Sequence, residues 1–142
     1  MTISSVPPVS PDRSVVAALA AASAAFLVWA LLSLAAGSVD GGRFVIREAW
    51  DDTPYWLFGL PLVAVVVTIA GYVAPWRVWR WPLYAAAGQA VAMAFVHPPG
   101  TDLGLLPLAV IFIGLPLMIV LTVPALIAGT LARRGWSWEL LL

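Results

Sequence analysis

Residues 15–36 read VVAALAAASAAFLVWALLSLAA, an apolar run without a single charged side chain. At ~1.5 Å of rise per residue, one helix of this length crosses a hydrocarbon core of ~30 Å. A cleaved signal peptide with Arg13 as its basic region is the rival interpretation, but its apolar core would have only ~7–15 residues. The stretch therefore predicts a retained transmembrane helix.

Three further apolar runs follow, at residues 54–73, 81–96 and 103–131. The last would be ~43 Å long as a straight helix, which exceeds the bilayer core. Prolines within a helix remove an amide donor and crowd the preceding turn, so we expect this span to bend at one of its prolines. The sequence thus predicts an all-α membrane protein with four transmembrane helices and a proline-kinked fourth span; the prolines of that span are Pro107, Pro116 and Pro124.

Composition agrees with this class and limits the chemistry. The chain is 63% hydrophobic and 10% charged, whereas soluble domains are roughly half apolar and one-quarter charged. We expect a disordered tail over residues 1–13, a transmembrane domain over residues 14–134, and a C-terminal tail over residues 135–142. The formal net charge is zero, so nothing indicates a nucleic-acid partner.

Missing residue types exclude several functions. The 142 residues include no Cys and no Lys, and His97 is the only histidine. Disulfides, thiol catalysis and Schiff-base cofactors are therefore excluded on this chain, and it cannot alone supply a bis-His haem site. No Asp, Glu, Lys, Arg or His falls inside a predicted span, although ion-coupled pumps and proton relays usually need such a side chain. We expect no cofactor, no metal and no catalysis.

The arginines predict the orientation. With the N-terminus in the cytoplasm, five arginines lie inside and two outside, which satisfies the positive-inside rule. Seven of the eight tryptophans also fall at span ends, as aromatic belts do. We expect both termini in the cytoplasm and a location in the cell membrane, in a bacterium the inner membrane. The inner arginines are Arg13, Arg77, Arg80, Arg133 and Arg134, and the outer ones Arg43 and Arg47.

Polar and aromatic residues near the spans are candidate functional positions. Gln89, in the middle of the third span, either hydrogen-bonds a neighbouring helix or lines a solute path. The connector between the second and third spans is predicted to anchor the chain at the lipid interface, through Trp76, Arg77, Trp79, Arg80 and Trp81. The outer loops gather charged side chains that either cap helices and face water or form an interaction site: Arg47, Glu48, Asp51, Asp52 and His97.

Two other features bear on packing. Small residues spaced about one helical turn apart let helix backbones approach closely; they recur at Ala18, Ala22 and Ala25 or Gly37, and at Ala86, Ala90 and Ala94. Residues 37–53 form the longest polar loop, in which Phe44, Val45, Ile46 and Trp50 suggest a short amphipathic segment in the interface.

Three functions compete on these grounds. The first is a non-catalytic accessory or assembly subunit of a larger membrane complex, in contact with lipids and other membrane subunits. The second is a small oligomeric transporter or channel, with Gln89 and the kinked fourth span lining the path. The third is a membrane enzyme that acts on a lipid or quinone through the outer acidic cluster. The absence of any catalytic motif favours the first.

Overall fold

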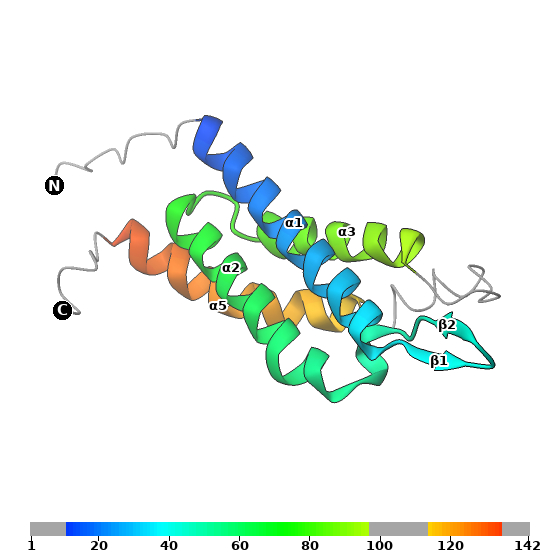
Figure 1. Cartoon of the computed structure of the whole chain (residues 1–142). Helices are drawn as coiled ribbons and strands as arrows, with labels where there is room; N and C mark the ends of the chain where they lie inside the picture. Colours follow the sequence, from blue (N-terminus) through cyan, green and yellow to red (C-terminus); the bar gives the residue numbers. More distant parts are fainter. Residues whose placement is uncertain (1–10, 97–113, 135–142) are drawn as a thin grey trace, which may run out of the picture.

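The computed structural model describes residues 11–96 and 114–134. Within this part of the chain the elements are mostly helical, and they run side by side with one short hairpin at the end (Figure 1). In chain order they are α1 (Pro11–Ala36), β1 (Ser38–Asp40), β2 (Arg43–Val45), the 3-10 turn η1 (Ala49–Asp51), the π-helical turn η2 (Tyr55–Gly59), α2 (Leu60–Val73), α3 (Arg80–Phe95) and α5 (Leu115–Arg133).

Three helical segments in the described residues are long and apolar enough to span a membrane. They are Asp12–Ala36, Tyr55–Val73 (η2 together with α2) and Leu115–Arg133. The predicted third span is helical as α3, but its 16 residues rise only about 24 Å. That is less than the ~30 Å of a hydrocarbon core, so a fourth crossing stays a prediction.

The predicted fourth span, residues 103–131, is described only from residue 114 onward. Pro116 is the second residue of α5, and Gly114 just before α5 already has helical dihedral angles. Pro124 lies inside α5, where it lacks the backbone N–H that would donate a helical hydrogen bond. Pro107 lies outside the described residues, and the kink of the whole span stays a prediction.

The loop after α1 differs from the expected amphipathic segment. It forms an antiparallel hairpin in which Ser38 pairs with Val45 and Asp40 with Arg43. Gly41 and Gly42 make the turn with φ values of 54° and 80°. Positive φ at both central residues is the geometry of a type I′ turn, whose twist matches that of the strands and which two glycines adopt without strain. The Gly-Gly pair was the signal for this hairpin.

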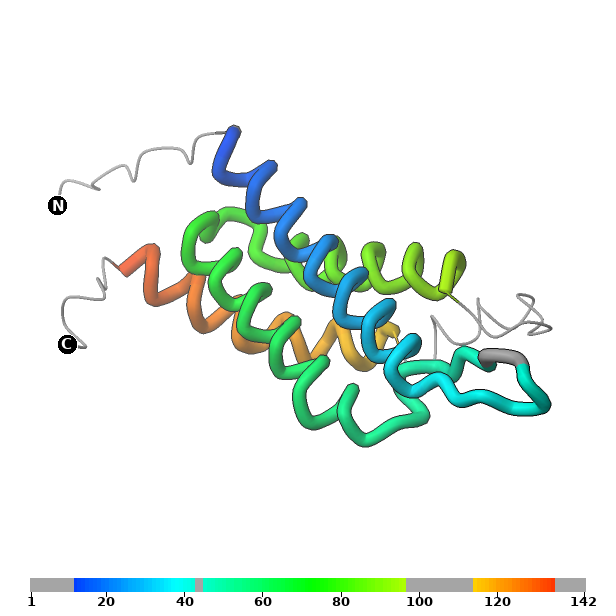
Figure 2. The backbone as a smooth tube through the Cα atoms, viewed as in Figure 1, coloured from blue at the N-terminus to red at the C-terminus, as the bar shows by residue number. Residues whose placement is uncertain are grey.

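Close helix contacts are made at glycines. A Cβ built on Gly88 of α3 would overlap the backbone of Ala22 in α1. A Cβ on Gly71 of α2 would lie 2.7 Å from the carbonyl oxygen of Ala125 in α5. The helices therefore pack as two pairs, α1 with α3 and α2 with α5. Figure 2 shows the course of the backbone through both pairs.

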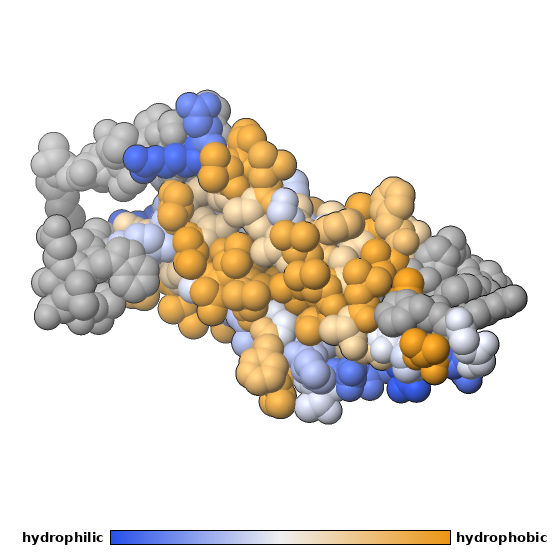
Figure 3. Space-filling model, viewed as in Figure 1, coloured by the Kyte–Doolittle hydropathy of each residue, from blue (hydrophilic) through white to orange (hydrophobic). Residues whose placement is uncertain are grey.

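Charged groups lie at two opposite ends of the helices. The Arg133 guanidinium donates a hydrogen bond of 2.8 Å to the carbonyl oxygen of Pro75, which joins the end of α5 to the α2–α3 connector. The first residues of α1 lie at this same end, and the hairpin lies at the other (Figure 1). Between them, on the face shown in Figure 3, hydrophobic residues make up most of the surface of the helices. The two arginine groups of the topology prediction thus fall at opposite ends.

Candidate functional site: a polar pair in an apolar cavity

The most polar contact between helices joins Tyr55 and Gln89. The Tyr55 hydroxyl donates a hydrogen bond of 3.1 Å to Oε1 of Gln89. Tyr55 begins η2 and is 2% exposed, while Gln89 lies in the middle of α3 and is half-buried. In hydrocarbon such a bond replaces an otherwise unsatisfied polar group, so it fixes how η2 sits on α3.

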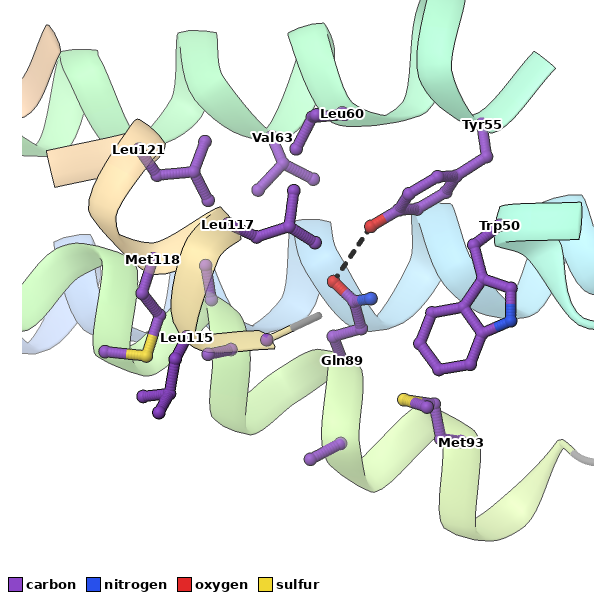
Figure 4. A pocket seen from close by; sticks show the side chains of 14 residues that line it. Trp50, Tyr55, Leu60, Val63, Gln89, Met93, Leu115, Leu117, Met118 and Leu121 are labelled. Carbon is purple, nitrogen blue, oxygen red and sulfur yellow. Dashed lines mark hydrogen bonds between the residues drawn. The ribbon is translucent and has the colours of Figure 1, made fainter. Parts of the chain in front are cut away.

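This pair lies at the edge of a cavity of about 60 Å³. Its walls come from η2 and α2, from α3, and from the beginning of α5 (Figure 4). The volume is well below the ~150 Å³ of an apolar cavity that binds benzene, so it suits a few water molecules or the end of an acyl chain. The lining is Trp50, Tyr55, Leu60, Val63, Ala85, Ala86, Gln89, Ala90, Met93, Gly114, Leu115, Leu117, Met118 and Leu121.

Aromatic rings close the hairpin end of this cavity. Trp29 packs edge-on against Trp50 at 4.7 Å and against Tyr55 at 5.6 Å between ring centroids. The indole N–H of Trp56 donates a hydrogen bond of 2.8 Å to the Trp50 carbonyl oxygen. The Nε1 of Trp29 and the Oγ of Ser33 are buried and have no hydrogen-bond partner among the described residues. Ring contacts, rather than polar ones, therefore hold Trp29 in place.

Sequence reasoning missed Tyr55 and Trp29. Tyr55 stands at the boundary of a span, where a tyrosine is ordinarily an interfacial anchor. Its contact with Gln89 depends on how two helices lie together across 34 residues of sequence, and no spacing rule reports that. Trp29 is the one tryptophan of the eight that lies away from the proposed belts. Its position in the middle of an apolar run was the available signal that its ring packs inside the protein.

Four of the five outer-loop candidates lie among the described residues. Arg47, Asp51 and Asp52 are exposed and Glu48 is half-buried. The Asp52 carboxylate accepts a hydrogen bond of 3.2 Å from the backbone N–H of Thr53, just before η2. Among the described residues no three His, Cys, Asp or Glu side chains lie together in a way that could hold a metal ion. His97 lies outside the described residues.

The tryptophans of the connector between α2 and α3 differ in how far they are exposed. Trp76 and Trp79 are 46% and 54% exposed, and the Arg80 guanidinium lies 5.7 Å from the centre of the Trp79 ring. Trp81, in contrast, is 2% exposed and donates its indole N–H to the Ala74 carbonyl oxygen at 3.2 Å. Trp81 therefore packs inside the protein, where its hydrogen bond joins the two ends of the connector, instead of facing the lipid interface.

Arg77 gives the connector its shape. Its φ of 57° is the only positive value outside glycine in the described residues, and a left-handed conformation is unusual for a long side chain. The side chain is exposed, so the turn directs its charge away from the helices.

Comparisons with known proteins give no relative: no protein-family model matches the chain, and neither a curated protein nor a solved structure is detectably similar to it.

Proposed function

We propose that this chain is a small non-catalytic integral membrane protein that serves as an accessory or assembly subunit of a larger membrane complex. It works by packing against partner helices, with four spans and both termini in the cytoplasm, in a bacterium at the inner membrane. Support comes from the apolar helices and from the five arginines at one end.

The main observation behind this proposal is a groove between α1 and α3. It measures about 450 Å³ and opens outward. Its floor is made of small side chains, and larger apolar residues border it. Small residues allow a partner backbone to approach closely, and van der Waals packing is the main force between helices in lipid. The proposed occupant is a transmembrane helix of a partner subunit; the lining is Ala22, Ser23, Phe26, Leu27, Ala87, Gly88 and Val91.

A crosslinking experiment tests the groove directly. The chain contains no Cys, so Ala87→Cys introduces a single thiol on the exposed side of α3. A thiol-linked photocrosslinker in native membranes is expected to give an adduct with a second membrane protein. The matched control is Val65→Cys, on an exposed position of α2 outside the groove. Equal adducts at both positions, or none at Ala87, would refute a docking role for the groove.

A blocking substitution gives the complementary result. Ala87→Trp fills the groove from its exposed wall without entering the core, and it is expected to abolish co-migration with a larger complex in native gels. Val65→Trp should leave co-migration intact at the same protein level. Migration of the unaltered protein alone, or only with itself, would exclude the accessory-subunit function.

The cavity at Gln89 supports a second candidate, a small oligomeric transporter or channel. Gln89 and the beginning of α5 line the same cavity, as a path along the fourth span would require. In liposomes that contain only this protein, solute flux that Gln89→Leu reduces would favour this function. The absence of flux for water and small neutral solutes would exclude it.

A further inference from the structure

A second groove lies between α1 and α2, at the end of the molecule that carries the five arginines. It measures about 310 Å³. Ala17 and Ala70 are 6% and 3% exposed and form its floor. The walls are apolar, and the charged residues Asp12 and Arg13 stand at the mouth; the other lining residues are Val16, Ala20, Val66, Ile69 and Val73.

The position and lining of this groove limit what can fill it. The groove lies along two helices that are apolar enough to span a membrane, so its walls face hydrocarbon when the protein is inserted. An apolar cavity does not hold water, because water there would lack hydrogen-bond partners. An acyl chain matches this apolar lining, and the volume of about 310 Å³ leaves room for a segment of one.

The charged residues near the mouth of the groove determine which lipid head group can bind there. Arg13 is exposed beside the groove, and the hydrophilic side chains at the beginning of α1 border the hydrophobic surface (Figure 3). Arg77, Arg80, Arg133 and Arg134 lie at the same end, where Asp12 is the one described acid, so five positive charges face one negative charge. Clusters of basic residues next to a membrane attract anionic lipids.

We propose that the α1–α2 groove is a binding site for an anionic phospholipid of the arginine-side leaflet. One acyl chain lies between Val16 and Ile69, and the phosphate pairs with the Arg13 guanidinium. The neighbouring Asp12 carboxylate repels the phosphate. A lipid therefore binds best when its negative charge lies on the Arg13 side of the mouth. This site is independent of the α1–α3 groove and of any partner subunit.

The test uses the purified, delipidated full chain. Native mass spectrometry measures the binding of phosphatidylglycerol and of phosphatidylcholine with the same acyl chains. Phosphatidylglycerol should bind more tightly. Arg13→Gln should weaken that binding about fivefold, the effect of roughly one basic residue near a lipid surface, and Asp12→Asn should strengthen it. Arg134→Gln is the charge control, because it removes an exposed arginine from the same end outside the groove.

Groove-filling variants test the acyl chain separately. Ala20→Phe enters the groove from an exposed position and should reduce binding of both lipids, whereas Leu19→Phe, exposed but outside the groove, should not. Circular dichroism checks that each variant keeps its helix content.

Three outcomes would overturn the proposal. Equal losses for Arg13→Gln and Arg134→Gln would show diffuse attraction without a site. Unchanged binding in Ala20→Phe would show that no chain occupies the groove. Full competition by inorganic phosphate would show that the head group alone is recognised.

Discussion

The Tyr55 hydroxyl and the Gln89 side-chain carbonyl lie 3.1 Å apart and form a hydrogen bond between η2 and α3. The bond lies beside an apolar cavity, and most of the cavity's other lining side chains are aliphatic. It therefore ties the second apolar helical segment to α3, beside the cavity that separates parts of the two helix pairs.

Removing this hydrogen bond should destabilise the protein measurably. Tyr55→Phe keeps the ring contacts with Trp29 and removes only the donor, which leaves Oε1 of Gln89 unpaired. Because Gln89 is half-buried, we expect a loss of about 0.5–1.5 kcal/mol, the typical net contribution of one hydrogen bond. Reversible unfolding in detergent would measure it.

A double-mutant cycle with Gln89→Leu then isolates the pair. Polar contacts between membrane helices average about 0.6 kcal/mol of coupling, with a maximum of about 1.7. We expect a value in this range. Strict additivity of Tyr55→Phe and Gln89→Leu would show that the two side chains do not interact.

The crossing of α1 and α3 predicts a second effect. Any side chain at Gly88 overlaps the backbone of Ala22, and backbone cannot move aside as a flexible side chain does. Gly88→Ala should therefore destabilise the protein by about 1–3 kcal/mol, as overpacking does. Ala94→Val, on an exposed face of the same helix, is the control and should have little effect. Equal stability of Gly88→Ala and the unaltered protein would mean that the helices are farther apart.

Gly88 also shows which part of the packing could be predicted. The small-residue spacing on α3 pointed to Ala86, Ala90 and Ala94. In the structure Ala94 is exposed, Ala86 and Ala90 line the cavity, and the buried face holds other residues. In a helix with alanine at so many positions more than one face has small-residue spacing, so the pattern could not select one; the buried set is Trp81, Pro82, Ala85, Gly88, Ala92 and Met93.

The helices themselves could be predicted, because the length of an apolar run depends only on residues that are neighbours in the sequence. The predicted spans 15–36 and 54–73 correspond to α1 and to η2 with α2, and α3 matches residues 81–96 within one residue at each end. The cavity and the aromatic contacts of Trp29 were not predictable. They depend on helix crossings, which are set by contacts between residues far apart in the sequence.

The hairpin turn supplies a prediction about local order. Gly41 has a φ of 54°, which asparagine adopts readily and a β-branched residue does not. Gly41→Asn should preserve the pairing of Val39 with Phe44. Gly41→Val should disfavour the turn by about 1–2 kcal/mol and speed amide hydrogen exchange in both strands. The helices should be unaffected in both variants. Identical exchange in the two variants would contradict a type I′ turn.

The last prediction concerns orientation. Five arginines lie at the end opposite the hairpin, and the positive-inside rule predicts that this end faces the cytoplasm. Single cysteines can report this without background, because the chain has none. Val39 is 73% exposed in β1, so Val39→Cys should react with a membrane-impermeant maleimide in intact cells. Arg77→Cys, in the exposed connector, should react only after permeabilisation, and its labelling in intact cells with Val39→Cys protected would reverse the topology. Removing one arginine of five leaves the charge asymmetry at four against two, so the reporter should not itself invert the protein. Labelling of both positions from outside would instead show that the α2 segment does not cross the membrane, because that segment separates the hairpin from the connector.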